Sequence, residues 1–148
     1  AWTAEHGLIL HPTKTRIVHV DEEGFEFLGY RFIKHRRFPR KKSLTKFKDA
    51  IRGKTRRANG HSLPAIIADI NRTTRGWFQY FKHCWPTTFS DLDSWIRGRL
   101  RSILRKRAGR RGRGKGEDHH RYPNAYFASL GLFSMKAAFD CECQPSRR

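Results

Sequence analysis

Acidic residues are scarce in this sequence. It contains 13 Asp and Glu against 32 Lys and Arg, which gives a formal net charge of +19 and a pI near 10.9. Small soluble domains usually carry a net charge of about 2 to 8. Positively charged side chains in such excess repel one another unless a polyanion neutralises them. Because each neutralised phosphate releases counterions, the composition favours a nucleic-acid partner over a merely solvated basic surface.

Other features are also rare or missing. No apolar run is long enough to span a bilayer and no signal-peptide core is present, so we expect no membrane association. Three cysteines, Cys84, Cys141 and Cys143, form no disulfide framework, which favours a reducing, cytoplasmic location. The chain opens at Ala1 and its one methionine is Met135, which suggests a piece of a longer protein.

The residues of catalytic and metal sites are poorly represented. No closely spaced aspartate pair is available to hold two Mg²⁺ ions, and no glycine-rich phosphate loop or Ser/His/Asp order stands out. Cys141 and Cys143, with His119 and His120, do not match zinc-finger spacing. We therefore expect no catalytic residue, no metal ion and no cofactor.

The first third of the chain predicts strands. Residues 15–20 are β-branched, residues 21–24 carry turn chemistry, and residues 25–33 resume as an aromatic-rich strand. A hairpin over residues 16–32 is expected, although two strands alone are marginal in water. The segment 35–42, with Pro39 and several cations, suggests a basic linker.

Helical periodicity begins at Ser43. The pattern predicts one helix from Ser43 to about residue 59, a second from Ser62 with Pro64 in its first turn, and a third opened by a capping box at residues 88–91. Three amphipathic helices with short connections predict a compact bundle. Residues 108–120 are expected to form a mobile loop, and residues 122–135 to pack back onto the bundle.

The expected fold class is therefore α+β, mostly α. A short N-terminal β-hairpin precedes a three-helix bundle and a short C-terminal helical segment. The expected domains are residues 1–36, residues 43–139 and a disordered tail at 140–148.

Candidate nucleic-acid contacts fall on the second and third helices. On the second, Arg72, Arg75, Gln79 and Lys82 share one stripe, with Tyr80 and Trp77 near it. Cations edged by aromatics suit a phosphate backbone with unpaired bases. For Trp77, core packing is the stronger interpretation on helical spacing.

The third helix repeats the pattern. Arg97, Arg101 and Arg105 recur every four residues opposite its apolar face, and Lys106, Arg110 and Arg111 follow. The sequence therefore predicts two adjacent cationic stripes that line one groove.

Several motifs resemble proteins encoded by group II introns. GLILHPTKT at residues 7–15 and GFEFLGY at 24–30 resemble the end of a reverse transcriptase palm, with a primer grip at Phe27, Leu28, Gly29 and Tyr30. RGWFQYF at 75–81, LDSWIR at 92–97 and PNAYF at 123–127 resemble the maturase-specific (X, or thumb) domain that follows the palm.

The resemblance implies a palm remnant followed by a thumb-like maturase domain. Its implied partners are group II intron RNA, which it would stabilise for splicing, and a template–primer duplex. The Tyr-Ala-Asp-Asp box is absent, so the chain itself is expected not to be an enzyme, although a full-length parent would be an RNA-directed DNA polymerase. Two alternatives stay open: a general nucleic-acid-binding module, or part of an active reverse transcriptase once joined to its N-terminal half.

Overall fold

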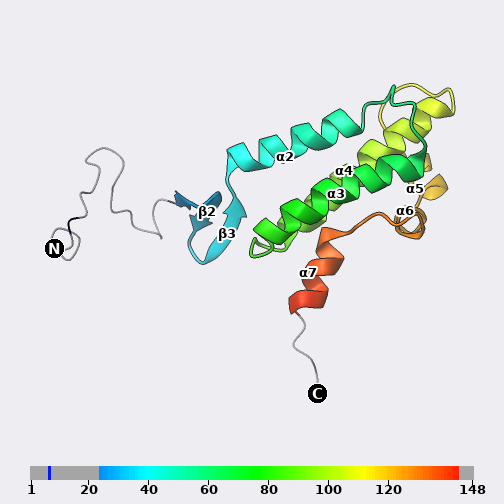
Figure 1. Ribbon diagram of the computed structural model, residues 1–148. Helices are drawn as coiled ribbons and strands as arrows, with labels where there is room; N and C mark the ends of the chain where they lie inside the picture. Colours follow the sequence, from blue (N-terminus) through cyan, green and yellow to red (C-terminus); the bar gives the residue numbers. More distant parts are fainter. Residues whose placement is uncertain (1–6, 8–23, 144–148) are drawn as a thin grey trace, which may run out of the picture.

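A small antiparallel sheet precedes a helical bundle in the computed structural model, which describes Gly7 and residues 24–143 (Figure 1). The expected class, α+β and mostly α, is confirmed. The elements are β1 (Phe25–Phe27), β2 (Tyr30–Ile33), β3 (Arg36–Pro39), α2 (Lys41–Lys54), α3 (Leu63–Phe81), α4 (Thr87–Arg107), α5 (Gly116–Arg121), α6 (Asn124–Ser129) and α7 (Met135–Cys143). No helix among the described residues is long and apolar enough to cross a membrane.

The sheet differs from the expected hairpin. Phe27 pairs with Tyr30, so the chain reverses at a two-residue turn of Leu28 and Gly29, with φ values of 49° and 83°. Positive φ at both turn positions matches the twist of a tight hairpin. The single strand expected over residues 25–33 is therefore wrong. The other strand of the expected hairpin, residues 15–20, lies outside the described residues.

Half of the segment expected to be a basic linker, residues 35–42, is a third strand, and its last two residues begin α2. β3 pairs with β2 in the register Tyr30 with Pro39 and Ile33 with Arg36. Among the described strands β3 is an edge of the sheet, where proline is tolerated because no partner needs its missing N–H. Its charges hid the strand signal, although Phe38 is half-buried and Pro39 is buried.

Helix boundaries follow backbone geometry more than the expected caps. α2 begins at Lys41, and Ser43 does not cap it. It ends at Lys54, where the Asn59 side chain donates to the Lys54 carbonyl over 2.8 Å. The expected capping box at residues 88–91 is also wrong, because α4 begins at Thr87 after Pro86 with no side-chain cap.

The start of α3 agrees with expectation. The Ser62 hydroxyl accepts a hydrogen bond from the Ala65 N–H, and a proline stands in the first turn. The apolar positions spaced three and four apart on α3 are buried, apart from the half-buried Trp77. This confirms the helical period as the strongest structural signal in the chain.

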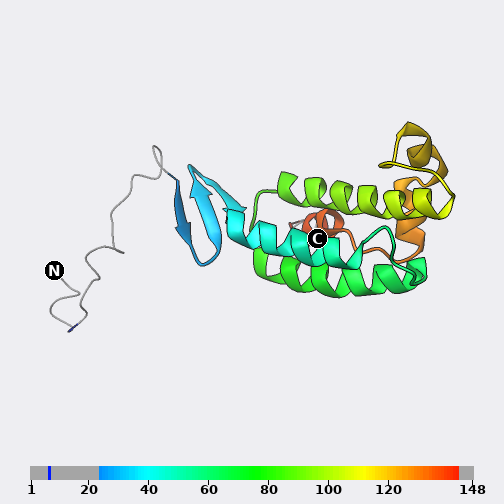
Figure 2. The same cartoon turned by 90° about the horizontal axis from the view of Figure 1, so that it is seen from above.

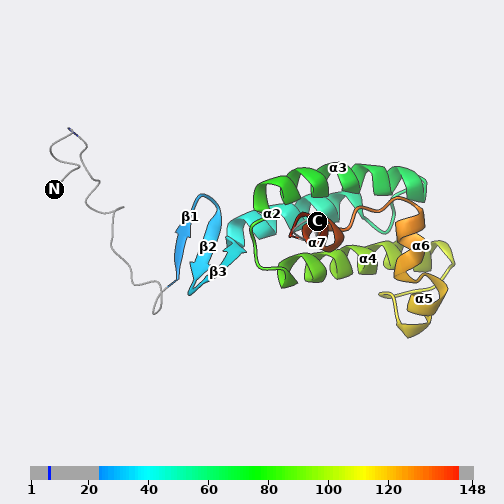
Figure 3. The same cartoon turned by 90° about the horizontal axis from the view of Figure 1, so that it is seen from below.

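The core lies where α2, α3 and α4 meet, and the C-terminal segment closes it. α7 lies between α3 and α4 (Figure 3). Residues 122–135 pack back onto the bundle as expected, since Phe127 and Met135 are completely buried. Ile51, Ile70, Phe89, Leu100 and Phe127 are completely buried. α7 continues through residue 143, so residues 140–143 of the expected disordered tail are helical; residues 144–148 lie outside the described residues.

Three polar side chains fasten the C-terminal segment to the bundle. Asp93 is 4% exposed and accepts from the Met135 and Lys136 N–H groups at the start of α7. The Asn71 side chain donates to the Gly131 carbonyl over 2.7 Å and accepts from the Phe133 N–H over 2.8 Å. Arg101 makes the third attachment, described below.

The sheet is joined to the bundle by reciprocal hydrogen bonds. The Tyr30 hydroxyl donates to the Tyr80 carbonyl, and the Tyr80 hydroxyl donates to the Leu28 carbonyl over 2.7 Å. The Tyr30 ring also packs on Phe81, with centroids 5.2 Å apart. The β1–β2 turn is therefore held against the C-terminal end of α3. The domain boundary expected between residues 36 and 43 stays a prediction.

Candidate nucleic-acid interface

An open groove runs between α2 and α3, the neighbouring helices in Figure 2. It measures about 620 Å³. Residues of α2, α3 and the β1–β2 turn line it: Gly29, Arg40, Ser43, Lys46, Phe47, Ala50, Thr73, Gly76, Trp77, Tyr80 and Phe81. This lining contains cations, aromatic rings and small residues, and no carboxylate.

Aromatic rings form a continuous series along the groove. Trp77 packs between Phe47 and Phe81, with centroid distances of 4.7 Å and 4.6 Å. Phe81 then contacts Tyr80 edge-on at 4.7 Å. Tyr80 is 55% exposed, which leaves ring surface for a ligand. Beside it, a side chain added at Gly76 would meet no atom within 4 Å, so α3 is open to close approach there.

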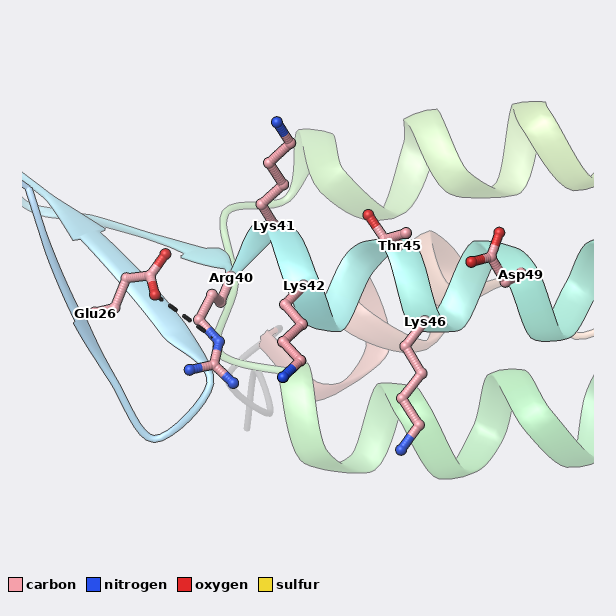
Figure 4. Close-up of a pocket in the computed structure, with 7 residues that line it drawn as sticks. All are labelled: Glu26, Arg40, Lys41, Lys42, Thr45, Lys46 and Asp49. Carbon is pink, nitrogen blue, oxygen red and sulfur yellow. Dashed lines mark ion pairs between the residues drawn. The ribbon is translucent and has the colours of Figure 1, made fainter.

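Cations border the groove along its α2 side. Arg40 and Lys46 line both the groove and a neighbouring depression of about 740 Å³ on the outer face of α2. Figure 4 shows Lys42 and Lys46 extending to one side of α2 and Lys41 to the other. The depression also holds Glu26, whose carboxylate lies 3.9 Å from the Arg40 Nε.

Two nitrogen atoms of groove-lining side chains are left without hydrogen bonds. The Arg40 Nε is too far from Glu26 for a hydrogen bond, and it has no other partner among the described residues. The Trp77 Nε1 is likewise buried without an acceptor in this part of the chain. Buried donors without partners are costly, and because neither nitrogen is accessible to solvent, a ligand acceptor would reach it only if the surrounding side chains moved.

The predicted stripe on α3 lies on a different side of that helix from the groove. Arg72, Arg75 and Gln79 are exposed, but the Arg75 guanidinium stacks 5.3 Å from the Phe133 ring, in the segment before α7. Lys82 is half-buried, and its Nζ lies 3.5 Å from the Glu142 carboxylate on α7. Of the predicted α3 contacts, only Trp77 and Tyr80 line the groove.

The predicted stripe on α4 is wrong as a solvent-facing surface. Arg101 is 3% exposed, and its guanidinium donates to the Tyr122 carbonyl and the Asn124 Oδ1, each over 2.9 Å. Arg97 is half-buried, and its Nη2 lies 3.2 Å from the Ser94 hydroxyl. The C-terminal segment covers this side of α4, so these arginines hold protein groups instead of lining a groove with α3.

Arg105 also has a structural role. Its Nη1 lies 2.8 Å from the Asp118 carboxylate, and both side chains are largely buried. The Lys115 N–H donates to the same carboxylate over 2.7 Å. That backbone hydrogen bond first, and then Arg105, lower the pKa of Asp118 against the opposing effect of burial.

The loop after α4 is anchored, in contrast to the mobile loop expected over residues 108–120. The Arg105 Nε donates to the Arg111 carbonyl over 2.8 Å, and α5 begins at Gly116. Lys106, Arg110 and Arg111 are exposed, as a binding role requires. Arg110 also lies 3.3 Å from the Glu117 carboxylate.

The primer grip-like residues lie at one end of the groove. Phe27 is 60% and Leu28 is 68% exposed, whereas Tyr30 packs against the core. Gly29 lies so close to α3 that an added Cβ would be 3.5 Å from the Tyr80 ring and 3.6 Å from Phe81. The turn therefore brings exposed apolar side chains next to Tyr80.

The basic residues of α2 were missed as candidate contacts. Lys41 and Lys42 fall in the segment expected to be a basic linker, and the sequence predicts no role for Lys46. The available signal was the composition of α2, whose outward positions carry cations with Asp49 as its only acidic residue.

Among the described residues, no group of three or more His, Cys, Asp or Glu side chains is placed to hold a metal ion. Cys84 is buried, and burial raises the pKa of its thiol to about 12. The neutral thiol is a poor nucleophile and a poor metal ligand.

Comparison with known families defines the class of this protein. The group II intron maturase-specific domain matches residues 44–122, which is 79 of the 148 residues. The match runs from the first turns of α2 to the residue after α5. The chain belongs to this family, as the resemblance implied, and so has a role in group II intron splicing. The matched domain is a non-catalytic one. Compared with curated proteins, the chain matches none.

Proposed function

We propose that the chain binds folded group II intron RNA through the groove between α2 and α3 and thereby supports splicing. The observation that carries this proposal is the lining of the groove, which combines Arg40 and Lys46 with an aromatic floor and contains no carboxylate. RNA offers phosphates for the cations and bases or sugars for the rings.

The proposed mechanism is preferential binding of the folded RNA. An intron that folds compactly brings many phosphates together, and their repulsion opposes the compact state. A rigid cationic surface binds the compact form better than the open form and shifts the RNA equilibrium toward it. The packed helices fix the backbone from which the lysines and Arg40 extend, which reduces the ordering cost of binding.

Variants of two exposed lysines test this basic side of α2: Lys46 lines the groove and the neighbouring depression, and Lys42 lines the depression. In a double variant, Lys42→Gln with Lys46→Gln, we expect affinity for a folded group II intron RNA to fall at least about fivefold. The slope of log K against log salt should also become shallower by about 1 to 2, because each lost phosphate contact removes about one counterion equivalent. Fluorescence anisotropy over a salt series measures both quantities.

A matched control distinguishes the loss of a localised binding site from the loss of overall positive charge. The double variant Arg56→Gln with Arg121→Gln removes the same charge at exposed positions that do not line the groove. Its affinity should remain within about twofold of the unmodified chain's, because isolated surface charges act mainly through the long-range field. Equal losses in both double variants would contradict a localised site. Equal affinity for duplex DNA at the same salt would favour a general nucleic-acid-binding module.

The α3 stripe and the loop cations extend this proposal as a second contact region. Arg72, Gln79, Lys106, Arg110 and Arg111 are exposed and lie outside the groove. Arg72→Gln and Lys106→Gln should each weaken RNA binding by less than Lys46→Gln, since neither side chain is backed by the aromatic floor. A larger loss for either would move the main contact to that surface.

A template–primer duplex is a second candidate ligand, as part of a longer reverse transcriptase. The exposed Phe27 and Leu28 at the end of the groove favour it, because apolar side chains suit the sugar edges of a duplex end. Replacing both with Ser should then weaken binding to an RNA–DNA hybrid more than to intron RNA. We also propose a reducing location, the cytoplasm, because the three cysteines are free thiols.

A further inference from the structure

A second cationic recess lies on the other flank of α2. Figure 2 shows α2 between α3 and α4, and this recess of about 400 Å³ opens between α2 and α4. Its lining contains four arginines, from α2, from the segment after α2, from α4 and from the loop that follows α4: Arg52, Arg57, Arg99 and Arg113. The other lining residues are Thr55, Trp95, Gly98, Ser102 and Gly114, so no carboxylate lines it.

Trp95 and Thr55 hold two of these arginines in place. The guanidinium carbons of Arg99 and Arg52 lie 5.4 Å and 5.7 Å from the Trp95 ring centre, within cation–π range. Arg99 donates to the Thr55 hydroxyl and, over 3.2 Å, to the Thr55 carbonyl. The Lys48 ammonium adds a third cation, 5.7 Å from the same ring.

The anchored loop supplies Arg113. Next to it, the Gly114 N–H contacts the Ser102 hydroxyl at 3.4 Å, and a Cβ at Gly114 would lie 3.1 Å from the Arg101 Cβ. Because glycine fits this approach, the loop can lie close against α4. Arg105 binds the Arg111 carbonyl before Arg113 and the Asp118 carboxylate after it, so the backbone at Arg113 is anchored on both sides.

The positive charge in the recess is poorly compensated. Arg52 pairs with Asp49 over 2.6 Å, whereas Arg57, Arg99 and Arg113 have no carboxylate within 4.0 Å among the described residues. Burial first, and then the charges of Arg52 and Arg57, lower the pKa of Arg99. Like charges held together in this way favour an anion that would relieve their repulsion.

We propose that the arginine recess formed by Arg52, Arg57, Arg99 and Arg113 binds a backbone phosphate of RNA, so that RNA contacts both flanks of α2. A guanidinium matches phosphate oxygens with paired N–H donors, and several of them converge here. Trp95 acts as a positioning residue, since cations lie over its ring. This inference rests on the proposed function and adds a second site to it.

The RNA arm of the test compares double variants. Arg57→Gln with Arg113→Gln should weaken binding to folded intron RNA at least about fivefold and make the salt slope shallower by about 1. The control, Arg56→Gln with Arg121→Gln, should stay within about twofold of the unmodified chain. If the recess variant equals this control while Lys42→Gln with Lys46→Gln still loses affinity, the recess proposal is overturned and the proposed function stands. If the unmodified chain does not bind intron RNA, both are overturned.

A stability arm distinguishes RNA from a free anion. The Tm is followed with inorganic phosphate and with chloride at equal ionic strength. Without RNA, the recess variant should unfold at the same temperature as the unmodified chain or higher, because removing crowded cations relieves repulsion. A lower Tm in chloride would instead make these arginines structural and overturn the proposal. A phosphate-specific rise in Tm that the recess variant loses, together with unchanged RNA affinity, would identify a free-anion site and overturn it as well.

Discussion

The role of Arg101 follows from the residues packed around it and not from the four-residue spacing of arginines along α4. Its guanidinium satisfies the Tyr122 carbonyl and the Asn124 side chain beneath the C-terminal segment. Arg101→Gln should therefore lower the free energy of unfolding by about 2–4 kcal/mol, because it removes two hydrogen bonds made by a buried charged group, each worth about 1.5–3 kcal/mol, while the exposed Asn124 side chain can bind water instead. Urea unfolding followed by circular dichroism measures the change.

Lys106→Gln on the same helix is the control for this prediction. Its side chain is exposed, so its effect should stay within about 0.5 kcal/mol. Equal unfolding free energies for the two variants would contradict a structural role for Arg101 and favour the exposed role expected from the sequence. The sequence showed the four-residue spacing of Arg97, Arg101 and Arg105, but spacing alone does not tell which side of a helix a later segment covers.

Cys84 permits a chemical test of burial. Its thiol is 2% exposed, and burial raises its pKa to about 12, so almost none of it is thiolate at pH 8. Iodoacetamide should modify the exposed Cys141 and Cys143 within minutes and leave Cys84 unmodified until urea unfolds the chain. Peptide mass spectrometry over time identifies each site. Rapid labelling of Cys84 in the folded protein would contradict its position in the core.

Among the elements, α5 and the loop before it depend on one carboxylate. The hydrogen bond from Lys115 and the ion pair with Arg105 lower the pKa of Asp118, so its charged form stabilises the fold. A lowered pKa gives stability that is complete above the ordinary aspartate value of about 3.9 and is lost as pH falls through the folded value.

Asp118→Asn isolates this contribution. The unmodified chain should be more stable than this variant by a constant amount above about pH 5, and the difference should shrink below about pH 4 as Asp118 is protonated. Urea unfolding at several pH values measures it, and the other carboxylates cancel because they titrate in both proteins. A difference that grows toward acid pH would mean that the pKa is raised instead.

The β1–β2 turn is the second element whose behaviour depends on one residue. Gly29 has φ +83° and lies against Tyr80 and Phe81. Gly29→Ala should cost about 1–2 kcal/mol, because a Cβ disfavours positive φ, while Gly53→Ala in the open interior of α2 should be neutral or stabilising. Thermal unfolding of both variants tests this, and equal effects would contradict a strained turn.

These elements show what sequence can establish. The spacing of Ile66, Ile70 and Phe78 predicted α3 and its buried face correctly, since helical periodicity is a local property. β3 was missed because its cations suggested a linker, although Phe38 is half-buried and Pro39 is buried. Of the residues that line the groove, Trp77 and Tyr80 were predicted from the sequence as contacts. The α2 side of the groove, and the arginine recess, depend on how helices distant in sequence come together, which residue patterns do not specify.

For the whole molecule, net charge governs how salt affects stability. The charge of +19 opposes the compact state through self-repulsion, and salt shortens the range of that repulsion from about 30 Å at 0.01 M to about 8 Å at 0.15 M. The same salt weakens the ion pairs, but most of those seen among the described residues are partly exposed and contribute little. Screening of repulsion should therefore dominate.

We expect the Tm to rise by at least about 4 °C between 0.01 M and 0.3 M NaCl, which corresponds to a stabilisation of roughly 1 kcal/mol. Affinity for RNA should fall over the same range, because competing cations reduce the gain from counterion release. Sodium chloride is the appropriate salt, since phosphate or sulfate would also occupy an anion site. Differential scanning calorimetry and anisotropy on one preparation measure the two trends together. A Tm that falls with NaCl would show that local ion pairs, above all Arg105 with Asp118, outweigh the repulsion of the whole charge.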